Sequence, residues 1–71
     1  MEAKVSNRIA MILDLKDWNQ TVLAKKADID EGQLSKIING REPRLRNALK
    51  ICRALELPVE KVFNFENGFS A

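Results

Sequence analysis

Residues 19–40 read NQTVLAKKADIDEGQLSKIING, and the first half of this stretch has the pattern of a short helix. Val22, Leu23 and Ala27 recur at helical spacing. Asn19 precedes them, and its side-chain oxygen can accept a hydrogen bond from the free amides of a first helical turn. The pattern ends at Asp28. The stretch therefore predicts a helix that begins at residue 20 and a break close to Asp28.

The second half of the stretch predicts another short helix. Leu34, Ile37 and Ile38 recur at i, i+3 and i+4, which places them in one buried stripe. Asp30 is a suitable N-cap, and the pair Asn39-Gly40 tolerates the left-handed backbone that ends many helices. Two short helices joined by a tight turn with small residues form the layout of a helix-turn-helix, here over about residues 20–38.

The outward face of the second helix carries polar groups. At 100° per residue, the positions opposite the apolar stripe are Gly32, Ser35, Lys36 and Asn39, with Glu31 and Gln33 on the flanks. Hydrogen-bonding groups, one cation and one residue without a side chain suit the base edges of a DNA major groove. The solvated face of any small helical protein has a similar composition, so the face alone leaves both interpretations open.

The ordered set of residues resembles the Cro and lambda-repressor group of helix-turn-helix regulators, also called the XRE type. The matching positions in the motif are Gln20, Leu23, Ala24, Ile29, Asp30, Leu34, Ser35 and Gly40. Those that follow it are Pro43, Leu45, Leu49, Cys52 and Leu55. The resemblance covers about residues 5–63. It implies an all-α fold of five short helices, and a transcriptional regulator of the phage or bacterial repressor type that binds double-stranded DNA sequence-specifically.

Two departures from the family pattern bear on the fold. The elbow between the helices usually holds Gly, whereas here it holds Asp28, so we expect either an unusual backbone conformation at this position or a slightly different turn. Many relatives also have an Arg in the first helix facing a Glu late in the second helix of the motif. Leu13 and Ile38 occupy the matching positions here, so a hydrophobic contact is expected in place of an ion pair.

The resemblance also implies which residues meet DNA. Base contacts fall to Glu31, Gly32, Gln33 and Lys36, and phosphate contacts to Asn19, Gln20, Ser35, Asn39, Gly40, Arg41 and Arg44. Lys36 can donate to guanine, Gln33 can pair with adenine, and Glu31 can accept from cytosine. Two alternatives stay open: Glu31 could serve only the helix dipole, and Ser35 could cap its own backbone.

Composition limits the other possibilities. A chain of 71 residues with 45% hydrophobic content predicts one folded domain over residues 1–71. The net charge of +2 comes from residues 19–46, which contain six basic and four acidic residues, and a basic excess in the motif suits phosphate binding.

One cysteine and no histidine exclude an internal disulfide and a zinc site, so we expect Cys52 in the core. Neither a nucleophile–base pair nor a phosphate-binding glycine loop is present, so no enzyme, cofactor or metal is expected. The sequence has neither a signal peptide nor an apolar run long enough to span a membrane, so it predicts a cytoplasmic protein.

The remaining sequence predicts three further helices. The first spans residues 3–16, with Val5, Ile9, Ile12 and Leu13 inward and with Met11 and Leu15 covering neighbouring helices. The fourth spans residues 44–55, with Leu45, Ala48, Leu49, Cys52 and Leu55 inward, and the fifth starts at Pro58, with Val59, Val62 and Phe63 inward. Trp18 is expected to anchor the edge of the core rather than to stack on a base. Phe65 and Phe69 continue into the tail at residues 66–71, where they could close the core or form a dimer contact.

Partners follow from the resemblance. A single domain of this size makes few DNA contacts, so we expect a homodimer on a pseudo-palindromic operator, formed either in solution or only on DNA. The alternative is an antitoxin-like module that binds a protein partner through its apolar tail and also binds DNA.

Overall fold

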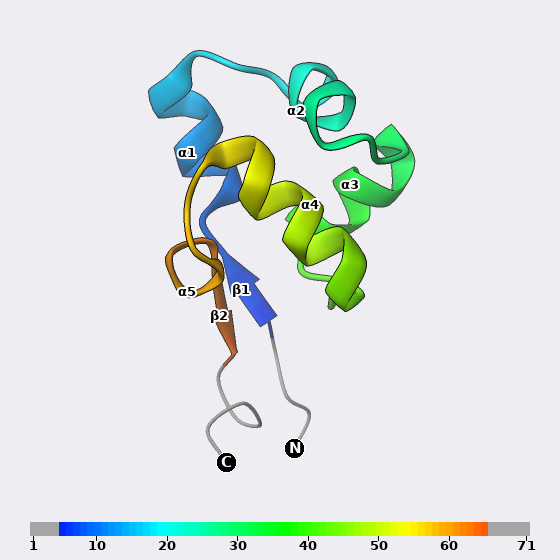
Figure 1. Cartoon of the computed structure of the whole chain (residues 1–71), viewed down its shortest axis with the longest axis vertical. Helices are drawn as coiled ribbons and strands as arrows, with labels where there is room; N and C mark the ends of the chain where they lie inside the picture. The colour runs from blue at the N-terminus through cyan, green and yellow to red at the C-terminus, as the bar shows by residue number, and fades with distance from the viewer. Residues whose placement is uncertain (1–4, 66–71) are drawn as a thin grey trace.

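The fold contains the five short helices that the sequence predicts. In the computed structural model, the chain is described from residue 5 to residue 65, and its side chains from residue 7 to residue 64. The helices are α1 (Ile9–Lys16), α2 (Gln20–Ala27), α3 (Glu31–Ile38), α4 (Leu45–Leu55) and α5 (Val59–Val62), shown in Figure 1. The expected all-α class is therefore confirmed, with one small addition at the two ends of the described chain.

That addition is a two-stranded sheet. Strand β1 (Val5–Asn7) pairs antiparallel with β2 (Phe63–Phe65), and Asn7 lies opposite Phe63. The prediction that the first helix begins at residue 3 was wrong, because residues 5–7 form β1 and α1 begins at Ile9. Spacing within one segment cannot reveal a strand partner at the other end of the chain. Phe65 thus belongs to β2, whereas Phe69 and the predicted tail lie outside the described residues.

The core receives side chains from every helix. Each of them contributes at least one fully enclosed residue: Ile9 in α1, Leu23 in α2, Leu34 in α3, Ile51 and Leu55 in α4, and Val62 in α5. Each such burial stabilises the fold by roughly 1.5–3 kcal/mol. The predicted core role of Cys52 is confirmed, since its side chain is buried in this cluster. Trp18 packs against the edge of the cluster, as predicted.

The buried face of α4 differs from the prediction at three positions. Leu45 and Leu49 were expected inside but are 74% and 49% exposed, whereas Ile51 is fully buried. Met11 and Leu15 in α1 are also exposed rather than covering other helices. The buried stripe of α4 is rotated about the helix axis from the predicted one by about half of the 100° that separates successive residues. The packing of α4 against α2 selects which edge of this amphipathic helix is buried.

Three helices end at an acidic residue in the left-handed conformation. These residues are Asp17 after α1, Asp28 after α2 and Glu56 after α4, with φ between 58° and 60°. The unusual backbone expected at Asp28 is therefore confirmed. Glycine usually occupies this position because its hydrogen replaces a Cβ that approaches the carbonyl oxygen. Within the described residues, no helix is both long and apolar enough to cross a membrane.

Candidate nucleic-acid interface

Both helices of the motif begin at the predicted caps. The Asn19 side chain accepts a hydrogen bond from the amide of Val22 at 2.9 Å. The Asp30 carboxylate accepts one from the amide of Gln33 at 3.2 Å. Each cap satisfies an amide that has no partner inside its helix. The caps therefore fix where α2 and α3 begin.

The angle between α2 and α3 is held by contacts across the elbow. The amide of Ile29 donates to the carbonyl of Ala24 at 3.0 Å, which closes the end of α2. The hydroxyl of Thr21 in α2 donates to the carboxylate of Glu31 in α3 at 2.9 Å. In the free protein, Glu31 is therefore oriented toward α2, and it would have to share or leave this bond to read a base.

The outward face of α3 has the predicted polar composition. Gly32, Lys36 and Asn39 are exposed, and Ser35 is half-buried. Within the described residues, the side chains of Lys36 and Asn39 form neither a hydrogen bond nor an ion pair, so both are available to an outside partner. Glu31 and Gln33 stand on opposite flanks of this face: Glu31 contacts α2, and Gln33 lines a groove beside α4.

Gly32 has a role inside the fold as well as on its surface. A Cβ at this position would lie 3.1 Å from the Asp30 carboxylate oxygen that caps α3. This separation is tighter than most real Cβ contacts, so with a larger residue the Asp30 carboxylate would have to shift by a few tenths of an ångström. The absent side chain therefore protects the start of α3 and also leaves its outward face low at this point.

Gly40, which was predicted to contact a phosphate, uses its backbone amide in a hydrogen bond to the end of α3. Gly40 has a φ of 114°, and its amide donates to the carbonyl of Ile37 at 3.0 Å. The amide of Arg41 donates to the carbonyl of Lys36 at 3.0 Å. A phosphate contact from the Gly40 amide would have to share this bond. The side chains of Asn39, Arg41 and Arg44, all exposed, are the freer candidates in this stretch.

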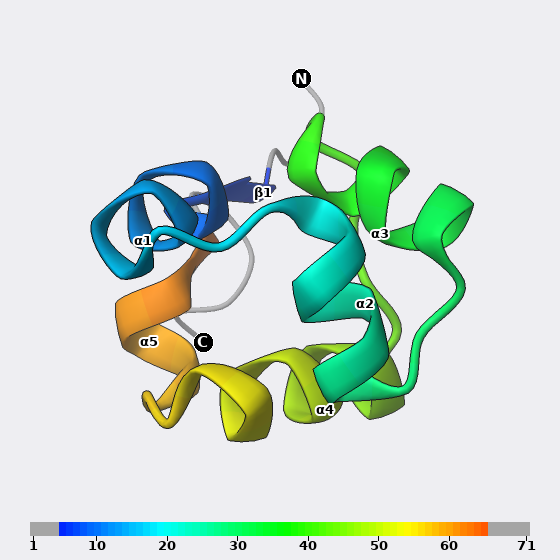
Figure 2. The same cartoon turned by 90° about the horizontal axis from the view of Figure 1, so that it is seen from above.

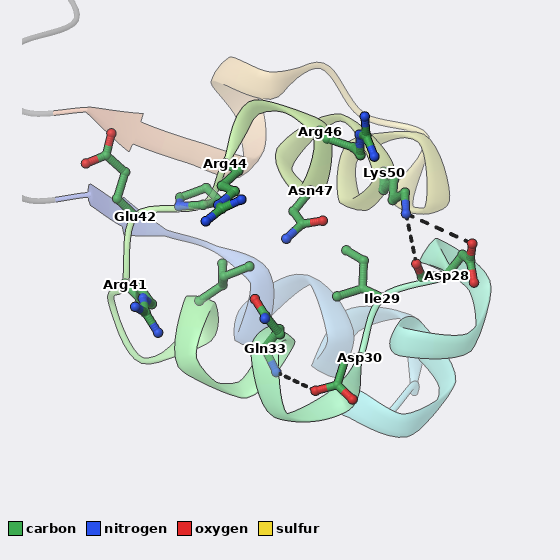
Figure 3. Close-up of a pocket in the computed structure, with 12 residues that line it drawn as sticks. Asp28, Ile29, Asp30, Gln33, Arg41, Glu42, Arg44, Arg46, Asn47 and Lys50 are labelled. Atoms are coloured by element: carbon green, nitrogen blue, oxygen red, sulfur yellow. Dashed lines mark hydrogen bonds and ion pairs between the residues drawn. The ribbon is translucent and has the colours of Figure 1, made fainter.

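A polar groove of about 760 Å³ separates α3 from α4 (Figure 3). Gln33 from α3 and Asn47 from α4 point into it from opposite sides. Its basic residues are Arg41, Arg44, Arg46 and Lys50, and its acidic residues are Asp28, Asp30 and Glu42. The sequence analysis assigned no role to Arg46, Asn47 or Lys50. Their spacing along α4 marks the polar side of that helix, which could have identified them.

Trp18 holds two further cations close to the start of α2. The ammonium of Lys16 lies 5.0 Å from the centre of the Trp18 ring, and that of Lys26 lies 4.9 Å away. Both separations fit cation–π attraction. The indole therefore uses its surface for the core edge and for two lysines, which leaves little of it for stacking on a base.

Comparisons with known proteins agree with this geometry. The profile of the family described as "Helix-turn-helix" matches residues 9–62. None of the curated proteins compared with the chain matches it. Among solved structures, the fold is similar to the "crystal structure of a putative DNA-binding protein from Bacteroides fragilis". The TM-score is 0.71 at 23% identity, over 84% of this chain and 98% of that one. At this identity the likeness shows the fold, and the profile match over most of the chain shows the family. The chain belongs to the helix-turn-helix family.

Proposed function

We propose that the protein binds double-stranded DNA sequence-specifically and regulates transcription as a repressor. The observation that carries the proposal is the outward face of α3, where Lys36 and Asn39 are exposed and have no side-chain partner within the described residues. Membership of the helix-turn-helix family supports DNA as the partner. Capped helices and a braced elbow present this face with little freedom to reorganise, which favours specific binding.

In this proposal α3 enters the major groove and α2 lies across the sugar–phosphate backbone. Lys36 donates to a guanine, and Gly32 lets the helix approach closely. Gln33 and Glu31 act at the flanks of the face. Phosphates are bound by Asn19, Gln20, Ser35, Asn39, Gly40, Arg41 and Arg44, as the family resemblance implies.

The test is duplex binding as a function of salt. A binding site selected from a random pool should lose affinity steeply as salt rises, with a log–log slope of about −0.9 per phosphate neutralised. A scrambled duplex of the same length is the control for specificity. Absence of binding at low salt, or a flat salt response, would reject the proposal.

We further propose that two copies bind one pseudo-palindromic operator. Exposed leucines on α4 support a protein contact, because Leu45 and Leu49 lie one turn apart and expose 74% and 49% of their surfaces. Light scattering with and without operator measures the stoichiometry, which should be two chains per operator. The same apolar pair also supports the second candidate, an antitoxin-like module with a protein partner. A small protein that co-purifies in equal amount and is lost in Leu49→Lys would favour that second function.

A further inference from the structure

Asn7, the last residue of β1, forms hydrogen bonds to two helices through one side chain. Its Oδ1 accepts from the amide of Ile9 at 3.1 Å, at the start of α1. Its Nδ2 donates to the carbonyl of Ile37 at 3.0 Å and lies 3.4 Å from the carbonyl oxygen of Ile38. An amide requires an acceptor and a carbonyl requires a donor, so these partners fix which way the Asn7 amide points. One half-buried side chain thus connects α1 to the last turn of α3 (Figure 2 shows β1 beside α3).

Asn7 can hold α3 because its own backbone is fixed. It pairs with Phe63 of β2, a residue that is only 3% exposed. The next amide along, that of Arg8, donates to the carbonyl of Val62 at 2.9 Å. The last carbonyls of a helix have no partner within the helix, and that of Ile37 is held from outside by two donors, the Gly40 amide and the Asn7 side chain.

We propose that Asn7 is a positioning residue for base reading, an inference that rests on the proposed DNA binding. Lys36 and Asn39 flank the two carbonyls that Asn7 contacts, Ile37 and Ile38. The Asp30 cap and the Thr21–Glu31 bond hold the start of α3, and Asn7 holds its end. Base discrimination depends on the placement of these side chains within a fraction of an ångström, whereas phosphate attraction tolerates small shifts. Asn7 therefore controls specificity without touching DNA.

Two variants test this role. Asn7→Asp keeps an oxygen for the Ile9 amide, removes the donor to α3 and places a charge beside two carbonyls. Asn7→Ser replaces the Nδ2 donor with a hydroxyl on a shorter side chain and adds no charge, and that hydroxyl can still accept from Ile9. Asn64→Asp is the matched control for charge, because Asn64 lies in β2, is exposed and forms no side-chain hydrogen bond with a described residue.

The first measurement is amide hydrogen exchange in the free protein. In both Asn7 variants, exchange at Asn39, Gly40 and Arg41 should speed up by about threefold to tenfold, the factor that one hydrogen bond carries. Exchange at Leu23 in α2 should stay unchanged. The second measurement is the ratio of affinities for the selected and scrambled duplexes. This ratio should fall by a similar factor, while affinity for the scrambled duplex stays within about twofold of the charge-matched control.

Each result decides for or against the inference. Equal losses on both duplexes, or an unchanged ratio, would reduce Asn7 to a residue that only stabilises the fold. If the parent chain binds DNA but amide exchange at the end of α3 is the same in the Asn7 variants as in the parent, this inference alone is overturned. A parent chain that prefers no duplex would overturn the proposed function and this inference together.

Discussion

The ammonium of Lys50 in α4 lies 3.1 Å from the carbonyl oxygen of Asp28 and 4.0 Å from its carboxylate. Asp28 is the left-handed residue at which α2 ends and the elbow begins. The carbonyl end of a helix carries partial negative charge, so a cation is favourable here. Lys50 therefore connects α4 directly to the elbow of the motif, in addition to the packing of α4 against α2.

Removal of this contact should destabilise the fold measurably. We expect Lys50→Ala to lower the free energy of unfolding by at most about 1 kcal/mol, since the Asp28 side chain is 98% exposed and most of the effect comes from the hydrogen bond to the Asp28 carbonyl. Arg46→Ala is the control, because Arg46 is an exposed cation on the same helix, and its loss should change stability by less than about 0.5 kcal/mol. Thermal melting measures both, and equal losses would assign the effect to general charge rather than to the Asp28 contact.

Glycine at the end of α4 should stabilise the protein. Glu56 has a φ of 60° and places a negative charge at a helix C-terminus, so its conformation and its charge are both unfavourable. Glu56→Gly is expected to raise the free energy of unfolding by about 1 kcal/mol. Asp14→Gly makes a similar change inside α1 and should lower it by about the same amount. Denaturant titrations in which Glu56→Gly unfolds earlier than the parent would contradict the explanation.

The predicted contact between Leu13 and Ile38 can be tested by introducing the charged pair that many relatives have at these two positions. Leu13 is buried, and Ile38 packs partly buried against the same core. Ile38→Glu should lower the free energy of unfolding by about 2 kcal/mol or more, because the charge lacks a partner. Adding Leu13→Arg should recover part of this loss if the two positions touch. A double variant that melts below both single variants would show that they do not.

Removal of the Lys36 side chain and removal of the Arg44 side chain should change DNA binding in different ways. Lys36 is exposed on α3, whereas Arg44 occupies the N-cap position of α4 at the edge of the groove. Arg44→Ala should weaken binding to all duplexes and reduce the salt slope by about one unit. Lys36→Ala should cost roughly 1–3 kcal/mol on the preferred site and relax one base pair in each half-site. Titration against single-base variants of the operator separates them, and unchanged base preferences in Lys36→Ala would make Lys36 a phosphate contact.

Cys52 should be unreactive in the folded protein. Burial, and then the nearby charge of Glu60, raise the pKa of the thiol above its ordinary value of 9.0. Iodoacetamide at pH 8 should therefore modify Cys52 only after denaturant is added. Unfolded chains also lose the thiol proton at a lower pH than folded chains. Stability should accordingly decline as the pH rises past 9. Rapid modification without denaturant would show that the α4–α5 side of the core opens readily.

The sequence predicted those features whose causes are local. Asn19 and Asp30 are caps because each accepts a hydrogen bond from an amide three residues further along the chain. Asp28 can end α2 because Asp tolerates the left-handed conformation better than most residues. The outward placement of Lys36 follows from helical geometry and the position of Leu34. These features give the motif and most of the candidate surface.

Local sequence patterns did not predict the features that depend on distant segments. Residues near Val5 have helical spacing, but their pairing with β2 makes them a strand. Leu45 and Ile51 are both apolar, and only packing against the rest of the fold decides that Ile51 is the buried one. Lys50 and Asn7 bond to residues 22 and 30 positions away, which no local pattern reveals.

The pairing of β1 with β2 also has a consequence for topology. Val5 lies opposite Phe65, at the outer end of a two-stranded ladder, where the two chains are separated by roughly 5 Å. A tight turn of about two residues could join these positions without disturbing α1 to α5. Such a circularised domain could be opened again at the exposed Arg41–Glu42 loop. Its order of elements would change, yet every contact described for the candidate nucleic-acid interface outside that loop would persist.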